Sequence, residues 1–190
     1  MKYFKKLVGD RIYLSPRNSQ DVELFTKWLN DFQVTDYTGR SGIITTLEGE
    51  KQYLEQSAVE ENRHFVIVTL DKDEMIGTVS LERINHINRH AILGVFIGEE
   101  AYRNGGYGTE AINLILDYGF NYLNLNSIQL DVYAFNERAI ACYKKCGFQE
   151  AGKRRKAIFV NGNYYDIMQM DILREEFEQA GKEYIRNKNV

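Results

Sequence analysis

The sequence predicts an α+β domain with a mixed, mostly antiparallel central sheet flanked by helices. Three observations lead to this fold class. Two pairs of strand-like segments, at 64–83 and 149–170, are each joined by a short turn, which indicates antiparallel hairpins. The second of these turns is Asn161-Gly162, a dipeptide typical of a two-residue hairpin. A further apolar segment, 91–97, continues through a glycine-rich loop into a helical pattern, which adds a strand-loop-helix unit.

Length and composition fit one domain spanning residues 1–190. The chain has 190 residues and a mass of 22.1 kDa, which is enough for a substantial core. A net charge of -3 and a pI near 5.7 argue against a nucleic-acid-binding surface. No apolar run approaches the roughly 18 residues of a membrane span, and the amino terminus lacks a signal-peptide segment. We therefore expect a cytoplasmic protein without nucleic-acid or membrane partners.

The hydrophobic patterns and turn signals predict the elements in order. Strands are expected at 10–15, 64–70, 75–83, 91–97, 127–133, 149–160 and 163–170. Helices are expected at 20–30, 47–61, 109–122, from 136 onward, and at 172–187. The segment 31–44 between the first two helices is expected to be irregular.

Two helix starts are predicted from capping residues. Ser19 can accept a hydrogen bond from the first turn of the helix at 20–30. Thr45 and Glu48 have the spacing of a capping box for the helix at 47–61.

The glycine-rich loop at 103–108 reads Arg-Asn-Gly-Gly-Tyr-Gly and opens a helix, which predicts an anion site. Glycine lets the backbone approach a ligand closely, and the first N–H groups of a helix point outward without partners. The loop lacks the Gly-Lys-Ser/Thr ending of a Walker loop. Gly106, Gly108 and Ala111 fit a dinucleotide fingerprint, but Asp131 lies within the next strand rather than closing it. A glycine turn that binds no ligand is the remaining interpretation.

A second motif makes the pattern specific. Arg103-x-x-Gly106-x-Gly108 is followed by Asn136-x-x-Ala139-x-x-x-Tyr143-x-x-x-Gly147-Phe148. Together these motifs resemble the acetyl-CoA-binding core of the GNAT family of N-acetyltransferases, in particular its ribosomal-protein alanine and spermidine acetyltransferase branch. The resemblance covers about 75–170. It implies that the strands on either side of the glycine loop run parallel and splay apart to admit the pantetheine arm.

The resemblance assigns acetyl-CoA as cosubstrate and an amine as acceptor: a small polyamine, an amino sugar or a protein amino terminus. Backbone groups of the glycine loop would hold the pyrophosphate, strand residues would hold the pantetheine amides, and an asparagine would support the cofactor arm. The residues that match these roles are Phe96, Ile97, Arg103, Asn104, Gly105, Gly106, Tyr107, Gly108, Thr109, Asn136, Ala139 and Tyr143. Since many relatives dimerise, a homodimer is a further expectation.

Tyr143 is the predicted general acid, because a phenol stays protonated at neutral pH and can protonate a departing thiolate. The resembled branch often carries a glutamate after the alanine that begins the central strand, whereas this chain has Ile92. Glu82 and His86 are therefore the candidates for a general base, and the alternative is a water chain with no single basic residue. Cys142 and Cys146 have no second pair or clustered histidines, so no metal site is expected.

Two alternatives stay open at this point. One is a noncatalytic coenzyme A-binding sensor or partner module of the same fold, which the isoleucine at 92 would favour. The other is a dinucleotide-binding oxidoreductase, which would bind nicotinamide cofactors.

Overall fold

A computed structural model describes residues 2–57 and 62–179. Its strands are β1 (Leu7–Val8), β2 (Ile12–Pro16), β3 (Arg63–Thr69), β4 (Met75–Asn85), β5 (His90–Ile97), β6 (Ser127–Tyr133), β7 (Gln149–Val160) and β8 (Asn163–Leu173). Its α-helices are α1 (Val22–Leu29), α2 (Phe32–Thr35), α3 (Leu47–Ser57), α4 (Tyr107–Asn121), α5 (Glu137–Lys145) and α6 (Arg174–Gln179). Two 3-10 turns, Ser19–Asp21 and Glu100–Tyr102, precede α1 and α4.

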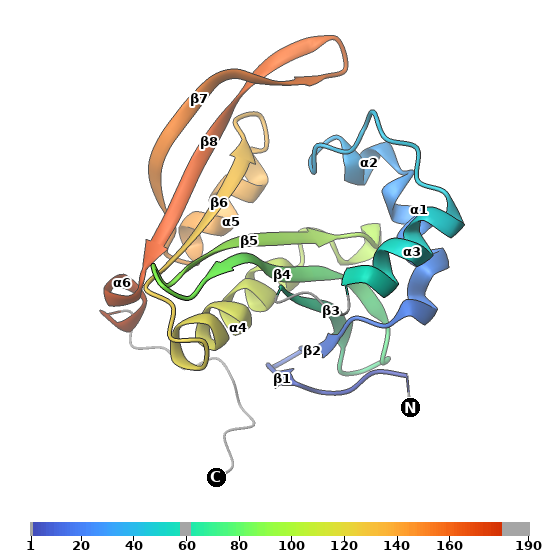
Figure 1. Ribbon diagram of the computed structural model, residues 1–190, viewed down its shortest axis with the longest axis horizontal. Coiled ribbons are helices and arrows are strands. Elements are labelled where there is room, and N and C mark those ends of the chain that lie inside the picture. Colours follow the sequence, from blue (N-terminus) through green and yellow to red (C-terminus); the bar gives the residue numbers. More distant parts are fainter. Residues whose placement is uncertain (1, 58–61, 180–190) are drawn as a thin grey trace.

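The eight strands form one sheet in the order β1-β2-β3-β4-β5-β6-β8-β7 (Figure 1). Every neighbouring pair is antiparallel except β5 and β6. These two strands run parallel because the loop and α4 connect them by a crossover. The predicted α+β fold with a mixed, mostly antiparallel sheet is confirmed.

The parallel pair separates soon after it begins. Its register ends at the pair Ile92 and Gln129, although β5 continues to Ile97 and β6 to Tyr133. The splay expected from the resemblance is therefore present. It leaves the second halves of the two strands on opposite sides of a gap.

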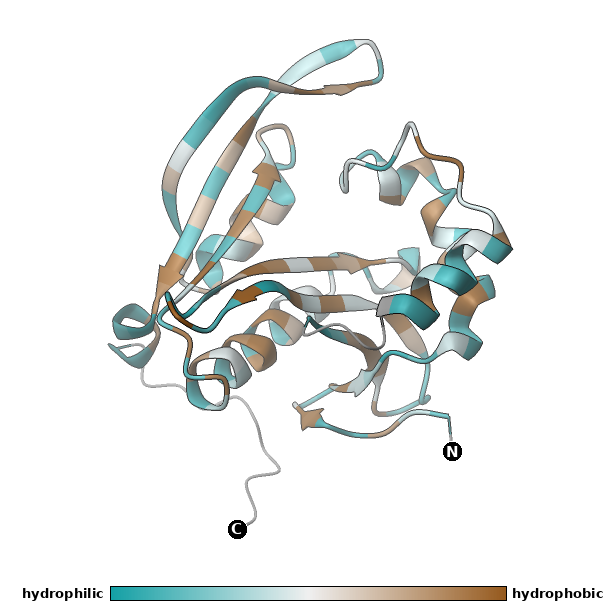
Figure 2. Ribbon diagram, viewed as in Figure 1, coloured by the Kyte–Doolittle hydropathy of each residue, from teal (hydrophilic) through white to brown (hydrophobic). Residues whose placement is uncertain are grey.

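Two apolar layers cover the sheet. Alternation along β3 sends Phe65 and Ile67 into a core with α4, and Val66 and Val68 into a second core with α1. The hydrophobic residues are concentrated in the central strands and along α4, whereas the middle of β7, at 153–156, is hydrophilic (Figure 2). No helix in the described ranges has both the length and the apolar character needed to cross a bilayer.

Strands β7 and β8 extend as a long hairpin beyond the rest of the sheet (Figure 1). The turn is the expected Asn161-Gly162 pair, and both residues have positive φ angles. This hairpin, called the arm below, is joined to the sheet through β8, whose residues 167–173 pair with the whole of β6.

Several local predictions were wrong. The short β1 and α2 were not predicted. Asn18 rather than Ser19 caps the first turn, accepting from the backbone N–H of Gln20, and Thr46 rather than Thr45 accepts from the N–H of Gly49. The tail helix begins at Arg174 and not at 172, because β8 keeps its pairing with β6 through Leu173. The parts of the predicted helices at 58–61 and 180–187 lie outside the described residues.

Candidate active site

A cavity of about 370 Å³ lies where β5 and β6 separate. Its walls come from β5, β6, the loop before α4, the first turns of α4, the helix α5, and the segment around α2. The cosubstrate-binding residues predicted from the sequence that line it are Phe96, Ile97, Arg103, Asn104, Gly106, Tyr107, Gly108, Thr109, Asn136, Ala139 and Tyr143. Gly105 is not among the lining residues, so the structure brings together all of the predicted group except this glycine.

The glycine loop has the backbone geometry that the anion-site prediction requires. Gly106 caps α4 with φ of +82°, in the left-handed region that favours glycine. The first helical hydrogen bond runs from the N–H of Glu110 to the carbonyl of Gly106, so the amides at 107–109 have no acceptor within the helix. A Cβ at Gly108 would meet only Ile97, at 3.9 Å, which leaves space over these amides. The residues present therefore fit a diphosphate group.

An ion pair between Arg11, near the amino terminus, and Glu110, on α4, stabilises this loop. Glu110 accepts hydrogen bonds from the backbone N–H groups of Asp10 and Arg11, both at 2.8 Å, and from the Arg11 guanidinium at 2.9 Å. Arg11 also donates to the carbonyl of Gly105 at 2.8 Å and lies 4.5 Å from the centre of the Tyr107 ring. Arg11 and Glu110 thus fix both sides of the loop, a role that the sequence did not reveal.

Arg103 belongs to the predicted cosubstrate-binding group and has a charge suited to a phosphate, but its guanidinium is engaged by protein groups. It donates to the carbonyls of Ile97 (3.2 Å) and Gly98 (2.8 Å) and to the side chain of Gln33 (3.1 Å). These bonds join the end of β5 to α2. Arg103 therefore shapes the cavity wall, and its direct contact with a phosphate stays a prediction.

Trp28 holds the same wall from the other side. Its ring packs edge-on against Phe96, with ring centres 5.8 Å apart, and its indole N–H donates to Glu99 at 2.9 Å. Lys27 donates to the same carboxylate oxygen at 3.0 Å. Burial alone would raise the pKa of Glu99, but the hydrogen bonds from Trp28 and Lys27 outweigh it and hold the pKa below its ordinary value. Trp28 is thus a core residue.

Helix α5 places Tyr143 in the cavity. The side chain of Asn136 accepts from the backbone N–H of Ala139 at 3.2 Å and so caps the helix; the expected support of the cofactor arm by Asn136 stays a prediction. Tyr143 packs against Phe148, with ring centres 5.9 Å apart, and lines the cavity. Burial, with a smaller contribution from the Cys142 thiol, raises the pKa of Tyr143 above its ordinary value. The phenol is therefore protonated at neutral pH.

Cys142 lines the cavity beside Tyr143, and the sequence did not mark it as part of the site. Its sulfur lies 3.1 Å from the hydroxyl of Thr109, in the first turn of α4, and Cys146 lies 3.9 Å from the Thr109 carbonyl. The hydrogen bond between the two thiols lowers the pKa of Cys142 and raises that of Cys146. Among the described residues no group of three or more His, Cys, Asp or Glu side chains could hold a metal ion.

Positive charge predominates around the cavity. Arg103, Arg138 and Lys145 line it, whereas Asp131 is the carboxylate among the lining residues and forms an ion pair with Arg154 of the arm. A cavity with helix N–H groups and several cations is suited to an anionic ligand.

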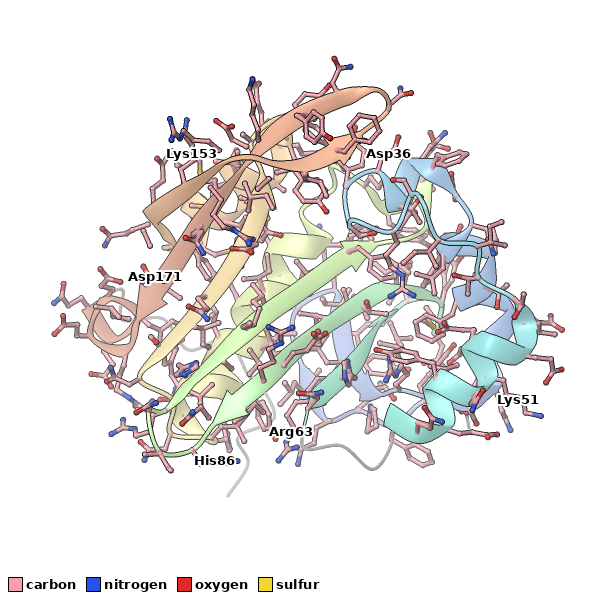
Figure 3. The ribbon with its side chains drawn as sticks, turned by 45° about the horizontal axis from the view of Figure 1, so that its top comes forward. Asp36, Lys51, Arg63, His86, Lys153 and Asp171 are labelled. Carbon is pink, nitrogen blue, oxygen red and sulfur yellow. The ribbon has the colours of Figure 1, made fainter. Side chains whose placement is uncertain are left out.

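The two candidate bases occupy different places. His86 lies at the turn of the β4–β5 hairpin, at the opposite end of the strands from the segment around Asp36 (Figure 3). Gln33, Val34 and Tyr37, which flank Asp36, line the cavity, and neither His86 nor Glu82 does. Glu82 lies on β4 directly opposite Ile92 of β5. A catalytic role for either residue stays a prediction.

Comparison with known proteins assigns this arrangement to a family. The model of the acetyltransferase (GNAT) domain matches residues 11–149. The chain belongs to the GNAT acetyltransferase family. A spermidine N(1)-acetyltransferase of Escherichia coli is 31% identical over 87% of this chain and 88% of its own length. A probable N-acetyltransferase of Bacillus subtilis, YjcK, is 34% identical over 91% of this chain and 99% of its own length.

A similar enzyme from Vibrio cholerae extends the comparison. This spermidine N(1)-acetyltransferase is 38% identical over 60% of this chain, and the match spans 65% of its own length, slightly less than two thirds. The crystal structure of a spermidine N-acetyltransferase from V. cholerae in complex with CoA and spermine superposes with a TM-score of 0.83. The superposition covers 88% of this chain and 98% of the V. cholerae chain, and the two sequences are 27% identical. The predicted GNAT family and the predicted enzyme class, N-acetyltransferase, are confirmed. The alternative of a dinucleotide-binding oxidoreductase is therefore wrong.

Proposed function

We propose that the protein transfers the acetyl group of acetyl-CoA to a primary amine, with Tyr143 as the general acid. The observation that carries this proposal is the position of a half-buried, protonated phenol in a cavity that also contains a helix N-terminus and three cationic side chains. Acetyl-CoA supplies an acetyl group activated as a thioester. The chain must therefore bind a diphosphate, hold an extended arm and protonate a thiolate.

Each of these tasks has residues suited to it. The amides at 107–109 would bind the pyrophosphate, and Arg138 and Lys145 would add positive charge around the phosphates. Within the described residues, the second half of β5 has no strand partner on its β6 side, so its backbone groups are available to the amides of a pantetheine arm. Tyr143 would donate its proton to the sulfur as the carbon–sulfur bond breaks.

The acceptor is proposed to be a small polyamine, an amino sugar or a protein amino terminus. Relatives named as spermidine acetyltransferases make spermidine the first amine to test. Two carboxylates near the cavity are engaged by the protein itself, since Asp131 pairs with Arg154 and Asp36 accepts from the hydroxyl of Ser41 at 2.6 Å. The ion pair with Arg154 offsets the charge of Asp131, the carboxylate among the lining residues, so amino sugars and protein amino termini are tested beside the polyamine.

Replacing Tyr143 by phenylalanine tests the proposal. The variant keeps the ring that packs against Phe148, so the affinity for acetyl-CoA should stay within about twofold. The turnover number should fall by about 10² to 10⁴, the usual contribution of a general acid. Tyr122→Phe, at an exposed position beyond α4, is the matched control and should behave as the unaltered protein. Turnover of Tyr143→Phe equal to that of the control would remove the tyrosine from the mechanism.

A further inference from the structure

A polar group lies on the face of β4 and β5 opposite α4, the face turned toward the viewer in Figure 3. Along β4, Val79 and Leu81 enter the core beneath α4, so Ser80 and Glu82 project from the other face. The hydroxyl of Ser80 donates to Oε1 of Glu82 at 2.8 Å. Nδ1 of His64, on the neighbouring strand β3, lies 3.9 Å from the same oxygen. Ser80, Glu82 and His64 are called the Glu82 group below.

A glycine on β5 makes room for this group. Gly94 lies opposite Ser80 in the strand register. A Cβ on Gly94 would lie 2.8 Å from the Ser80 hydroxyl and 3.5 Å from Oε1 of Glu82. The carboxylate of Glu82 therefore extends over Gly94, toward the second half of β5.

The second half of β5 forms part of the cavity wall. Val95, Phe96 and Ile97 all line the cavity. Gly94 and Phe96 share one face of the strand and are about 7 Å apart along it, from a rise of about 3.4 Å per residue. An amine that approaches the cavity across this face can reach the carboxylate directly or through one water molecule. Glu82 is also open to such a molecule, since 44% of its side-chain surface is exposed.

We propose that Glu82 is the general base of the reaction and that Ser80 and His64 position it. This inference rests on the proposed acetyl transfer. The acceptor ammonium gives one proton to the Glu82 carboxylate, and the neutral nitrogen then forms the carbon–nitrogen bond. As the carbon–sulfur bond breaks, the thiolate takes the proton of Tyr143, and the second nitrogen proton returns to the tyrosine. Glu82 releases its proton to solvent, so the net products are the amide, the free thiol and one proton.

The first test compares Glu82→Gln with the unaltered protein. Glutamine keeps the size and the hydrogen bond from Ser80 but cannot accept a proton. The turnover number should fall by about 10² or more, while the acetyl-CoA affinity and the unfolding temperature stay unchanged. Glu23→Gln, an exposed carboxylate on α1, is the matched control and should keep full turnover.

The second test restores a carboxylate one strand away. Ile92 is the cross-strand partner of Glu82 and projects from the same face. The double variant Glu82→Gln/Ile92→Glu should turn over at least about ten times faster than Glu82→Gln alone, because neighbouring strands are only about 4.8 Å apart. Ser80→Ala should lower the turnover number without changing the acetyl-CoA affinity, as expected for a positioning residue.

Three results would overturn the inference. The first is a turnover number of Glu82→Gln above one third of the normal value. The second is a turnover number that the double variant does not raise above that of Glu82→Gln, and the third is a Glu82→Gln variant in which only the KM of the amine changes. Absence of turnover by the unaltered protein with every amine tested is a different failure, because it contradicts the proposed acetyl transfer itself and removes the inference with it.

Discussion

The contact between Gly98 and Trp28 offers a quantitative test of how the cavity wall is built. A Cβ at Gly98 would lie 2.2 Å from Cδ2, 2.3 Å from Cε2 and 2.7 Å from Cε3 of the indole. Non-bonded carbons are normally about 3.5 to 4.0 Å apart. Gly98→Ala therefore forces either the ring or the strand end to move by more than 1 Å.

The indole has little room to move. Trp28 is 1% exposed, its ring contacts Phe25 and Phe96 edge-on, and its N–H is bonded to Glu99. Forcing extra volume into such a packed site costs about 1 to 3 kcal/mol, and we expect the upper end of this range here. For a chain of this size each kcal/mol corresponds to about 2 to 4 °C, so the unfolding midpoint should fall by about 6 to 12 °C.

Thermal unfolding followed by circular dichroism measures this effect. Gly42→Ala is the matched control, because a Cβ at Gly42 would meet no atom within 4 Å. The control should unfold at the normal temperature or slightly above it, since alanine reduces the entropy of the unfolded chain. If the midpoints of Gly98→Ala and Gly42→Ala agreed within about 2 °C, the described packing of Trp28 on Gly98 would be incorrect.

Three further predictions concern the site. Asn136→Ala should lower the stability by about 1 kcal/mol through loss of the α5 cap, and Asn136→Asp should retain most of it, as chemical denaturation can show. Arg103→Lys should lower stability by about 1 to 2 kcal/mol and weaken acetyl-CoA binding, measured by calorimetry, because lysine cannot bridge β5 and Gln33. Because the pKa of Cys142 is lowered, its side chain is a thiolate at pH values where an ordinary thiol is protonated. Iodoacetamide should therefore modify Cys142 at neutral pH, acetyl-CoA should protect it, and Cys146, whose pKa is raised, should react slowly. Equal modification rates at the two cysteines, measured by mass spectrometry, would contradict this assignment.

The parts of the fold predicted correctly depend on local patterns. The glycine loop and the motif on α5 are each continuous in sequence, so the resemblance they carry predicts the fold and 11 of the 24 residues that line the cavity. Short elements such as α2, with four residues, have too few positions to show a periodicity. The cap at Asn18 was assigned to its neighbour Ser19, because adjacent polar residues have similar capping ability.

The site residues that were missed depend on contacts distant in sequence. Arg11 and Glu110 are 99 positions apart, and no local pattern predicts that they meet at the glycine loop. The arginine at 103 has the charge expected of a phosphate ligand, but its three protein acceptors appear only when β5 and α2 are placed together. The pairing of Glu82 with Ile92 likewise follows from strand register, which depends on the whole β4–β5 hairpin.

Acetyl-CoA-dependent release of thiol is the most direct test of the central claim, that this cavity transfers an acetyl group to an amine. The purified protein would be assayed with spermidine, amino sugars, aminoglycosides and peptides with free amino termini, and the mass of each product would be determined. We predict thiol release that depends on one acceptor class, with a product heavier by one acetyl group. Tight binding of acetyl-CoA without thiol release for any of these amines would contradict the account.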